Sequence, residues 1–403
     1  MDSRLRGNDG GAGDAKWLTL ALADKTFNSI SMTTIPEILT SAIVTIDLAA
    51  LQSNYKTLAA QARAHSPATE TGAAIKGEAY GLGMEPCAKA LWAAGCRSFF
   101  VARPFEGAQL RVILPDALIF VLDGLYAGQA DYYLQHALIP ALISLDEAKD
   151  WAANGKGKHC AVHVDTGINR MGMTAKDYAG VVAMKDQLRI VLVISHLACS
   201  DEPQHPLNGK QRDLFAKYRM MLPDVPASFA NSSGIYLGDG YLYDLVRPGV
   251  ALYGGNPLPG QPNPMKPVVT LQLKIMQTRI VKQGDTIGYS ATWTAPRDSR
   301  IALLGAGYRD GIPRKLSWSA DKPAAQVFVG GRRVDVVGRV SMDMMAIDVT
   351  DLAEAATPRG TLVEIFGPNI SVDEAAGFAS TISYELLTHL GNRYARRYIG
   401  GES

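Results

Sequence analysis

Short apolar runs rich in β-branched residues alternate with segments of helical period from Ala42 onward. This alternation is typical of βα units that build a parallel sheet. The expected strands are 42–48, 72–76, 98–102, 118–124, 139–145, 161–167, 190–198, 227–233 and 245–254. The clearest helices between them are 48–64, 85–95, 145–155 and 210–222.

The run 42–48 leads through its helix into the sheet, so eight further strands remain for the sheet itself. Those strands and their helices span about 215 residues, close to the roughly 250 residues of a (β/α)8 barrel. We therefore predict an α/β protein with an N-terminal TIM-like barrel.

The pattern changes at the Pro/Gly-rich stretch 254–267. Beyond it, apolar strands follow one another with glycine turns and almost no helix, at 271–281, 285–295, 300–307, 324–340, 344–350 and 362–367. A final helix is expected over 370–391, ending at Gly391. We divide the chain into an N-terminal extension (1–40), a barrel (41–265) and a mainly-β domain (266–403).

Composition narrows the possible partners. The 403 residues are 47% hydrophobic and 20% charged, with a net charge of +1, so no global field attracts nucleic acid or an anionic membrane. No run approaches the ~18 apolar residues of a membrane span. The four cysteines form no CxxC motif or dense framework, which is typical of free thiols in a reducing compartment.

The N-terminal region holds one candidate export signal, WLTLALA at 17–23, but acidic residues precede it and no convincing cleavage site follows. We therefore expect a cytoplasmic protein. Met32 lies close to the first convincing strand, and we hypothesise that translation begins there. A peptide beginning before Met32 on the native protein would refute that hypothesis.

Lys76 ends an apolar strand just before the Gly/Tyr-rich turn AYGLG. Most lysines are solvated surface residues. A lysine at the carboxyl end of a barrel strand, however, lies where such barrels keep their chemistry, and a buried amine is what an aldehyde cofactor such as pyridoxal phosphate requires.

A phosphate anchor should accompany such a lysine. FANSSG (229–234) and RPGVALYG (247–254) end the last two barrel strands and offer the hydroxyls of Ser232 and Ser233 and the backbone donors around Gly249 and Val250. Each motif alone reads more simply as a turn. Arg247 stands at the mouth of the last strand, where its permanent charge would keep a pyridine nitrogen unprotonated.

Other motifs are set aside. The single DTG at 165–167 lies inside a βα pattern, unlike that of an aspartic protease. His159, His163 and Asp165 alternate onto one strand face, but nothing else has metal-ligand spacing, so we expect no metal and assign them as structural groups or as partners of an arginine. Tyr289, in GYSATWTA, is a second proton-transfer group far from Lys76 in sequence, although a lone tyrosine is most often a half-buried strand residue.

Nine segments in order resemble the alanine racemases, which are pyridoxal-phosphate enzymes of fold type III, from about Ala42 to Arg397. The segments are AAIKGEAYG (73–81), VDTGINRMG (164–172), SHLACSDE (195–202), ANSSG (230–234), RPGVALYG (247–254), GYSATWTA (288–295), GAGYRDGIPR (305–314), GRVSMDM (338–344) and ISYELL (382–387). The resemblance implies interconversion of L- and D-alanine, with D-alanine supplied for peptidoglycan, by a homodimer.

The resemblance also implies residue roles. Lys76 would hold the cofactor aldehyde and act as base on one face of the substrate, and Tyr289 from the partner subunit would serve the other face. The remaining positions implied for cofactor binding are Tyr80, His196, Ser232, Arg247, Gly249, Val250 and Tyr384. The positions implied for the substrate or its entrance are Arg170, Tyr308, Met342, Asp343 and again Tyr384, with Met342 and Asp343 supplied across the dimer.

Several positions depart from the family pattern. His163 stands where many members carry a carbamylated lysine that orients the arginine, so Arg170 must be held by His163 itself or by a bound anion. The usual Ala-Asn after the lysine is Gly77-Glu78, and the usual His is Leu82. Trp293 replaces a commoner tyrosine and changes little.

Three alternatives remain open. The first is an exported racemase of broader substrate range. The second is a decarboxylase of the same fold type, but that class uses a cysteine in its β domain, and Cys87, Cys96, Cys160 and Cys199 all precede residue 200. The third is a non-catalytic pyridoxal-phosphate carrier with a single barrel, which would need no second domain.

Overall fold

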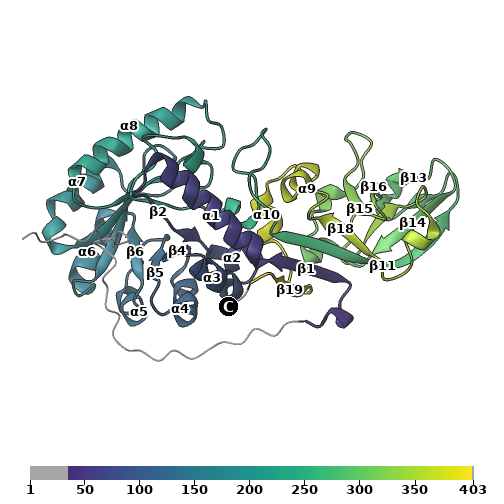
Figure 1. Ribbon diagram of the computed structural model, residues 1–403, viewed down its shortest axis with the longest axis horizontal. Helices are drawn as coiled ribbons and strands as arrows, with labels where there is room; N and C mark the ends of the chain where they lie inside the picture. The colour runs from purple at the N-terminus through teal and green to yellow at the C-terminus, as the bar shows by residue number, and fades with distance from the viewer. Residues whose placement is uncertain (1–34, 402–403) are drawn as a thin grey trace, which may run out of the picture.

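The computed structural model describes residues 35–401, which form two lobes joined end to end (Figure 1). The proposed start at Met32 and the candidate export signal at 17–23 lie outside the described residues. Within 35–401 no helix is long and apolar enough to cross a membrane.

The first lobe is a parallel barrel. Its sheet runs in the order β3-β4-β5-β6-β7-β8-β9, and a second pair, β10-β2, closes the ring beside it. The strands are β2 (Glu70–Thr71), β3 (Ala73–Ala74), β4 (Ser98–Val101), β5 (Leu118–Val121), β6 (Ile139–Leu142), β7 (His159–His163), β8 (Arg189–Ile194), β9 (Ala227–Ser228) and β10 (Leu245–Val246). Only Gly72 separates β2 from β3, so these two pieces count as one barrel strand and the predicted eight are present.

Helices surround this barrel (Figure 1). They are α1 (Leu48–His65), α2 (Lys76–Gly81), α3 (Met84–Ala93), α4 (Pro104–Ile113), α5 (Ala130–Gln135), α6 (Leu145–Asn154), α7 (Ala175–Ala183) and α8 (Pro206–Met221). Side-chain caps set several of their starts. For example, the Asp47 carboxylate accepts a hydrogen bond from the Ala50 N–H at 2.9 Å at the start of α1.

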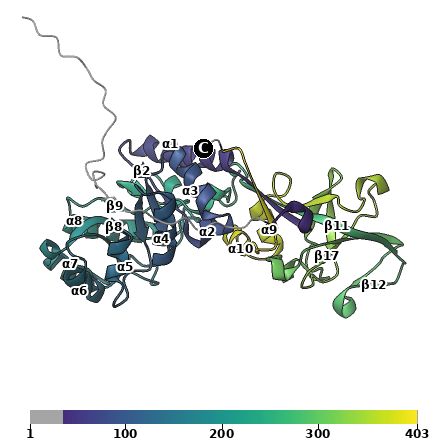
Figure 2. The ribbon, with the colours of Figure 1, turned by 90° about the horizontal axis from the view of Figure 1, so that it is seen from below.

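The second lobe is an eight-stranded sheet in the order β14-β17-β16-β15-β18-β11-β1-β19, with β14 also paired to β11. Its strands are β1 (Ala42–Asp47), β11 (Val269–Val281), β14 (Ser299–Leu304), β15 (Gln326–Val329), β16 (Arg332–Val337), β17 (Met345–Asp348), β18 (Leu362–Phe366) and β19 (Ala395–Ile399). A separate hairpin, β12 (Thr286–Ile287) with β13 (Trp293–Thr294), projects from the far end of this lobe (Figure 2). The predicted fold class, a TIM-like barrel followed by a mainly-β domain, is confirmed.

Two local predictions are wrong. β1 pairs with β11 and β19, so this strand belongs to the sheet of the second lobe although the division at residue 41 places it with the barrel. The single helix expected over 370–391 is broken into α9 (Val372–Phe378) and α10 (Ser383–Thr388), and β19 follows them. The break occurs at Ser380, whose φ of 53° is incompatible with a right-handed helix.

Candidate active site

Lys76 lies at the carboxyl end of the first barrel strand and begins α2, which is a left-handed turn. Gly77, Glu78, Ala79 and Tyr80 all have φ between 54° and 62°. For residues other than glycine this conformation costs roughly 1–2 kcal/mol each. Glu78, Ala79 and Tyr80, three such residues in a row, therefore need support from the surrounding protein.

That support comes from groups far away in sequence. The buried Glu106 carboxylate accepts hydrogen bonds from the N–H groups of Gly77 at 2.7 Å, Ala102 at 2.8 Å and Arg103 at 3.0 Å. At the other end of the turn, Arg396 donates to the Gly81 carbonyl at 3.0 Å and the Tyr398 hydroxyl to the Leu82 carbonyl at 2.8 Å.

None of these three supporting side chains was predicted from the sequence. Only Glu106 left a signal, because a proline followed two residues later by a glutamate is typical of a helix N-terminus. Arg396 and Tyr398 come from β19, which the sequence pattern did not reveal.

The amine of Lys76 lies among positive groups. Loss of hydration is the main cause that lowers its pKa, and Arg170 lowers the pKa further, whereas Glu106 opposes this shift. An amine with a lowered pKa is more often neutral, and only a neutral amine can attack an aldehyde or accept a proton.

Arg247 follows β10 and is buried, with 7% of its surface exposed. Its guanidinium donates to the Ser228 hydroxyl and the Ser195 carbonyl, each at 2.5 Å. Burial lowers the pKa of Arg247 to about 9, so the side chain keeps its charge at neutral pH. The barrel thus fixes a positive charge close to Lys76.

His163 ends β7 and is 4% exposed, and both of its ring nitrogens lack a hydrogen-bond partner among the described residues. Burial, and then Arg247 and Arg170, lower the pKa of His163 to about 3. His196, which follows β8, has its pKa lowered by burial and then by Arg247. Both imidazoles are therefore neutral at pH 7, and the structure shows no hydrogen bond from His163 to Arg170.

Asp165 organises the loop that carries Arg170. Its carboxylate accepts hydrogen bonds from the N–H groups of Gly167, Ile168 and Asn169 at 2.9, 3.1 and 3.3 Å. The Arg170 side chain itself is exposed. Asp165 thus holds the backbone of the loop that carries Arg170.

We expect His163 to make the protein sensitive to acid. The pKa of His163 is near 6.5 in the unfolded chain, whereas burial lowers it to about 3 in the folded protein. The stability that depends on neutral His163 is therefore complete above pH 6.5 and is lost progressively below it. Between pH 6.5 and 5 the free energy of unfolding should fall by about 1.5 kcal/mol more in the native protein than in His163→Gln.

Urea unfolding at several pH values and one protein concentration measures this difference. His65→Gln, at an exposed position, is the matched control and should follow the native pH dependence. Parallel curves for the native protein and His163→Gln would show that His163 is not held neutral.

The hydroxyls of Tyr80 and Ser232 and the backbone of Gly249 lie together beside Lys76, and we call this group the cradle. The Ser232 hydroxyl accepts hydrogen bonds from the N–H groups of Gly249 at 2.9 Å and Ala251 at 3.3 Å. A side chain at Gly249 would place its Cβ 2.3 Å from the Tyr80 hydroxyl, so only glycine permits this approach. The rings of Tyr80 and Tyr384 are 6.1 Å apart, which brings α10 of the second lobe to the same place.

Hydroxyls, backbone N–H groups and a nearby fixed cation are the donors that an organic phosphate needs. Val250 follows Gly249 directly and is buried. The structure therefore brings together the predicted barrel residues and Tyr384. No group of His, Cys, Asp and Glu side chains within 35–401 is arranged to hold a metal ion.

The other predicted residues lie elsewhere. Tyr289 is in a turn between β12 and β13, not in a strand, and 72% of its surface is exposed. That hairpin and α2 lie far apart in both views of the molecule (Figures 1 and 2). Tyr308, Met342 and Asp343 are also in the second lobe, on two exposed loops that contact each other.

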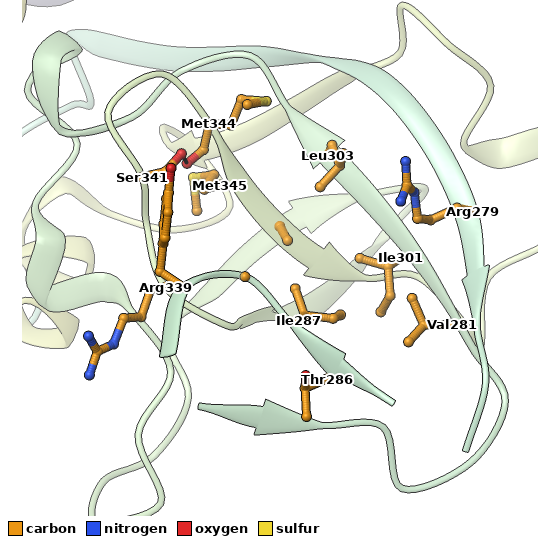
Figure 3. Close-up of a pocket in the computed structure, with 13 residues that line it drawn as sticks. Arg279, Val281, Thr286, Ile287, Ile301, Leu303, Arg339, Ser341, Met344 and Met345 are labelled. Atoms are coloured by element: carbon orange, nitrogen blue, oxygen red, sulfur yellow. Dashed lines mark hydrogen bonds between the residues drawn. The ribbon is translucent and has the colours of Figure 1, made fainter. Parts of the chain in front are cut away.

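Tyr289 is one of the residues that line a groove of about 490 Å³ in the second lobe. Figure 3 shows its apolar lining from several strands, with Ile287, Ile301, Leu303, Met344 and Met345 facing the space and Arg339 at its edge. The half-buried Arg339 donates at 2.9 Å to Ser290, the residue that follows Tyr289. Of this apolar lining, Ile301 and Met345 are buried and only Met344 is well exposed, so the groove presents a small, partly exposed apolar surface beside Tyr289.

Two family models cover almost all of the described chain. The alanine racemase N-terminal domain matches residues 46–257, and the alanine racemase C-terminal domain matches residues 268–398. The chain belongs to the alanine racemase family. The first match contains Lys76 and its cradle, and the second contains Tyr289, Tyr308, Met342, Asp343 and Tyr384.

Relatives within the alanine racemase family match over nearly their whole length. The alanine racemase of Rhodospirillum rubrum is 45% identical over 368 residues, which are 89% of this chain and 96% of the relative. A biosynthetic alanine racemase of Agrobacterium fabrum is 41% identical over 88% of this chain and 93% of its own length. The crystal structure of the Bartonella henselae alanine racemase with covalently bound pyridoxal phosphate has a TM-score of 0.83 and 38% identity, and the match covers 89% of this chain and 99% of that one.

Proposed function

We propose that the protein uses pyridoxal 5′-phosphate to interconvert L-alanine and D-alanine. The observation that carries the proposal is the single cluster at the carboxyl ends of the barrel strands: an amine of lowered pKa at Lys76, a buried cation at Arg247, and the cradle of Tyr80, Ser232 and Gly249. Membership of the alanine racemase family supports the choice of reaction. The four cysteines all lie in the barrel, which weakens the decarboxylase alternative.

The donors present fit the cofactor. Tyr80, Ser232, Gly249, Val250 and Tyr384 would hold its phosphate, and Arg247 would face its ring nitrogen with His196 behind it. When bound, pyridoxal phosphate supplies an electron sink that acidifies the proton on the substrate α-carbon. Arg247 weakens that sink, because a permanent cation at the ring nitrogen keeps it unprotonated.

Racemisation needs one proton-transfer group on each face of the α-carbon. We assign Lys76 to one face and Tyr289 to the other, and Arg170 to the substrate carboxylate. Because Tyr289 lies in the second lobe, far from Lys76 of its own subunit, it would come from the partner subunit of a head-to-tail homodimer, together with Tyr308, Met342 and Asp343. The apolar groove beside Tyr289 supports this assembly, in which a monomer should be inactive.

An assay of both enantiomers of alanine beside serine, lysine and arginine tests the proposal. We expect equal interconversion of L- and D-alanine and slow turnover of the larger substrates, because Tyr308 and Tyr384 would narrow the entrance. Comparable rates with lysine or arginine would indicate a broader racemase, release of CO2 a decarboxylase, and a bound cofactor without turnover a carrier. Within this proposal the enzyme is cytoplasmic and its D-alanine serves peptidoglycan.

A further inference from the structure

Three segments of the second lobe meet where the proposed entrance residues lie. They are the loop 307–311 with Tyr308, the loop 341–344 with Met342 and Asp343, and the segment 389–393 that follows α10. The N–H groups of Tyr308 and Arg309 donate at 3.0 Å to the carbonyls of Ser341 and Met342. A Cβ at Gly307 would lie 2.2 Å from the Ser341 carbonyl oxygen, so the two loops touch backbone to backbone.

Arg393 connects all three segments through its guanidinium. Its Nε donates to Asp310 Oδ1 at 2.6 Å, and one terminal nitrogen donates to Asp310 Oδ2 and to Asp343 Oδ1, both at 2.8 Å. Asp310 is 4% exposed and also accepts a hydrogen bond from the Gly307 N–H at 3.0 Å. Two parallel hydrogen bonds to one carboxylate fix the orientation of an arginine, which then holds Asp343 in place.

The core does not fix the entrance residues. Tyr308 and Met342 are 45% and 52% exposed, so apolar packing contributes little to their position. The Arg393 and Asp343 side chains are 46% and 53% exposed, and ion pairs of such exposure add little to folding stability. The main effect of the hydrogen bonds between Arg393, Asp310 and Asp343 is therefore to fix the positions of the two loops.

We propose that Arg393 is a positioning residue that fixes Met342 and Asp343 against Tyr308 and thereby sets substrate selectivity at the partner subunit's active site. This inference rests on the proposed shared site. In this proposal Arg393 affects substrate selectivity. Its effect is on the active site that contains the partner subunit's lysine, and not on the site that contains Lys76 of its own subunit.

Arg393→Ala should raise the KM for alanine and increase the ratio of serine to alanine kcat/KM by about tenfold, because a loosened entrance discriminates less between small side chains. The cofactor absorbance and cofactor affinity should not change. Arg393→Lys should be intermediate, because an ammonium keeps the charge but lacks the planar fork. Amide hydrogen exchange of 307–311 and 341–344 should become faster in Arg393→Ala.

Arg397→Ala is the matched control. Arg397 has the same 46% side-chain exposure, also binds one carboxylate through two nitrogens, that of Glu37, and lies four residues further along the chain. It should leave the substrate ratio and the exchange of both loops unchanged. An unchanged substrate ratio in Arg393→Ala, or an equal change in Arg397→Ala, would overturn the proposal.

Hybrid dimers from two differently tagged chains separate the two subunits. In a hybrid of Lys76→Ala with Arg393→Ala, the one site with a lysine receives its entrance loops from the chain with Arg393, so the native KM and substrate ratio should return. A hybrid that keeps the altered ratio would show that Arg393 acts on its own subunit's site, and would overturn the proposal.

A hybrid of Lys76→Ala with Tyr289→Phe tests the shared site independently, because one of its two sites combines an intact lysine with an intact tyrosine. Activity in this hybrid supports the proposed function. If the Tyr289→Phe hybrid is inactive, the shared site is overturned, and with it the role of Arg393. If the Tyr289→Phe hybrid is active but the Arg393→Ala hybrid keeps an altered substrate ratio, only the role of Arg393 is overturned.

Discussion

Lys76→Ala is expected to lower racemisation of alanine by at least about four orders of magnitude, because one change removes both the covalent attachment of the cofactor and the base on one face of the substrate. Lys76 lies at the carboxyl end of β3, beside the cradle of Ser232 and Gly249. The visible absorbance of the covalently linked cofactor should disappear with the activity. The left-handed turn should persist, because Glu106 binds the backbone of Gly77 and not the lysine side chain.

Absorbance, borohydride trapping of the cofactor and the racemase assay measure the effect of Lys76→Ala. Lys89→Ala, on the exposed face of α3, is the control and should keep the colour and the activity. A native protein that is folded but colourless after incubation with pyridoxal phosphate would contradict the assignment altogether.

The barrel was predictable because each of its strands is a short apolar run between helices of clear period. The sheet of the second lobe was predictable only in part. β1 has the same apolar pattern as a barrel strand, and it pairs with residues of β11 that lie 223 to 231 positions away in the sequence, which no local pattern encodes. The break between α9 and α10 depends on one residue, Ser380, whose left-handed backbone has no signal in its residue type.

The candidate site likewise contains residues that were predictable from the sequence and residues that were not. Lys76, Ser232, Arg247 and Gly249 follow barrel strands, and the carboxyl ends of parallel strands necessarily meet at one face. Glu106, Arg396 and Tyr398 act through hydrogen bonds to the backbone of the lysine turn, so their residue types do not reveal their task. The departure at Gly77 has a physical basis, because glycine readily adopts the left-handed conformation that begins this turn.

Tyr289→Phe is the second change with a large expected effect, and its effect should depend on the enantiomer. The substitution removes only a hydroxyl, so the exposed ring and the turn held by Arg339 and Ser290 should remain. Removal of a general acid or base costs typically 10²–10⁴-fold. Because Tyr289 is assigned to one face of the α-carbon, abstraction of the α-proton should fall by that factor for one enantiomer of alanine and far less for the other.

Incorporation of deuterium from D2O into L-alanine and into D-alanine, each measured before racemisation is complete, reports the two faces separately. Lys76 still serves its own face in Tyr289→Phe, so exchange without inversion should persist for the enantiomer whose proton points to the lysine. Trp293→Phe, in the same hairpin, is the matched control for packing around Tyr289 and should slow both enantiomers equally if it slows either. An equal loss for both enantiomers in Tyr289→Phe would count against two bases on opposite faces, because a single base that serves both faces must fail for both substrates together.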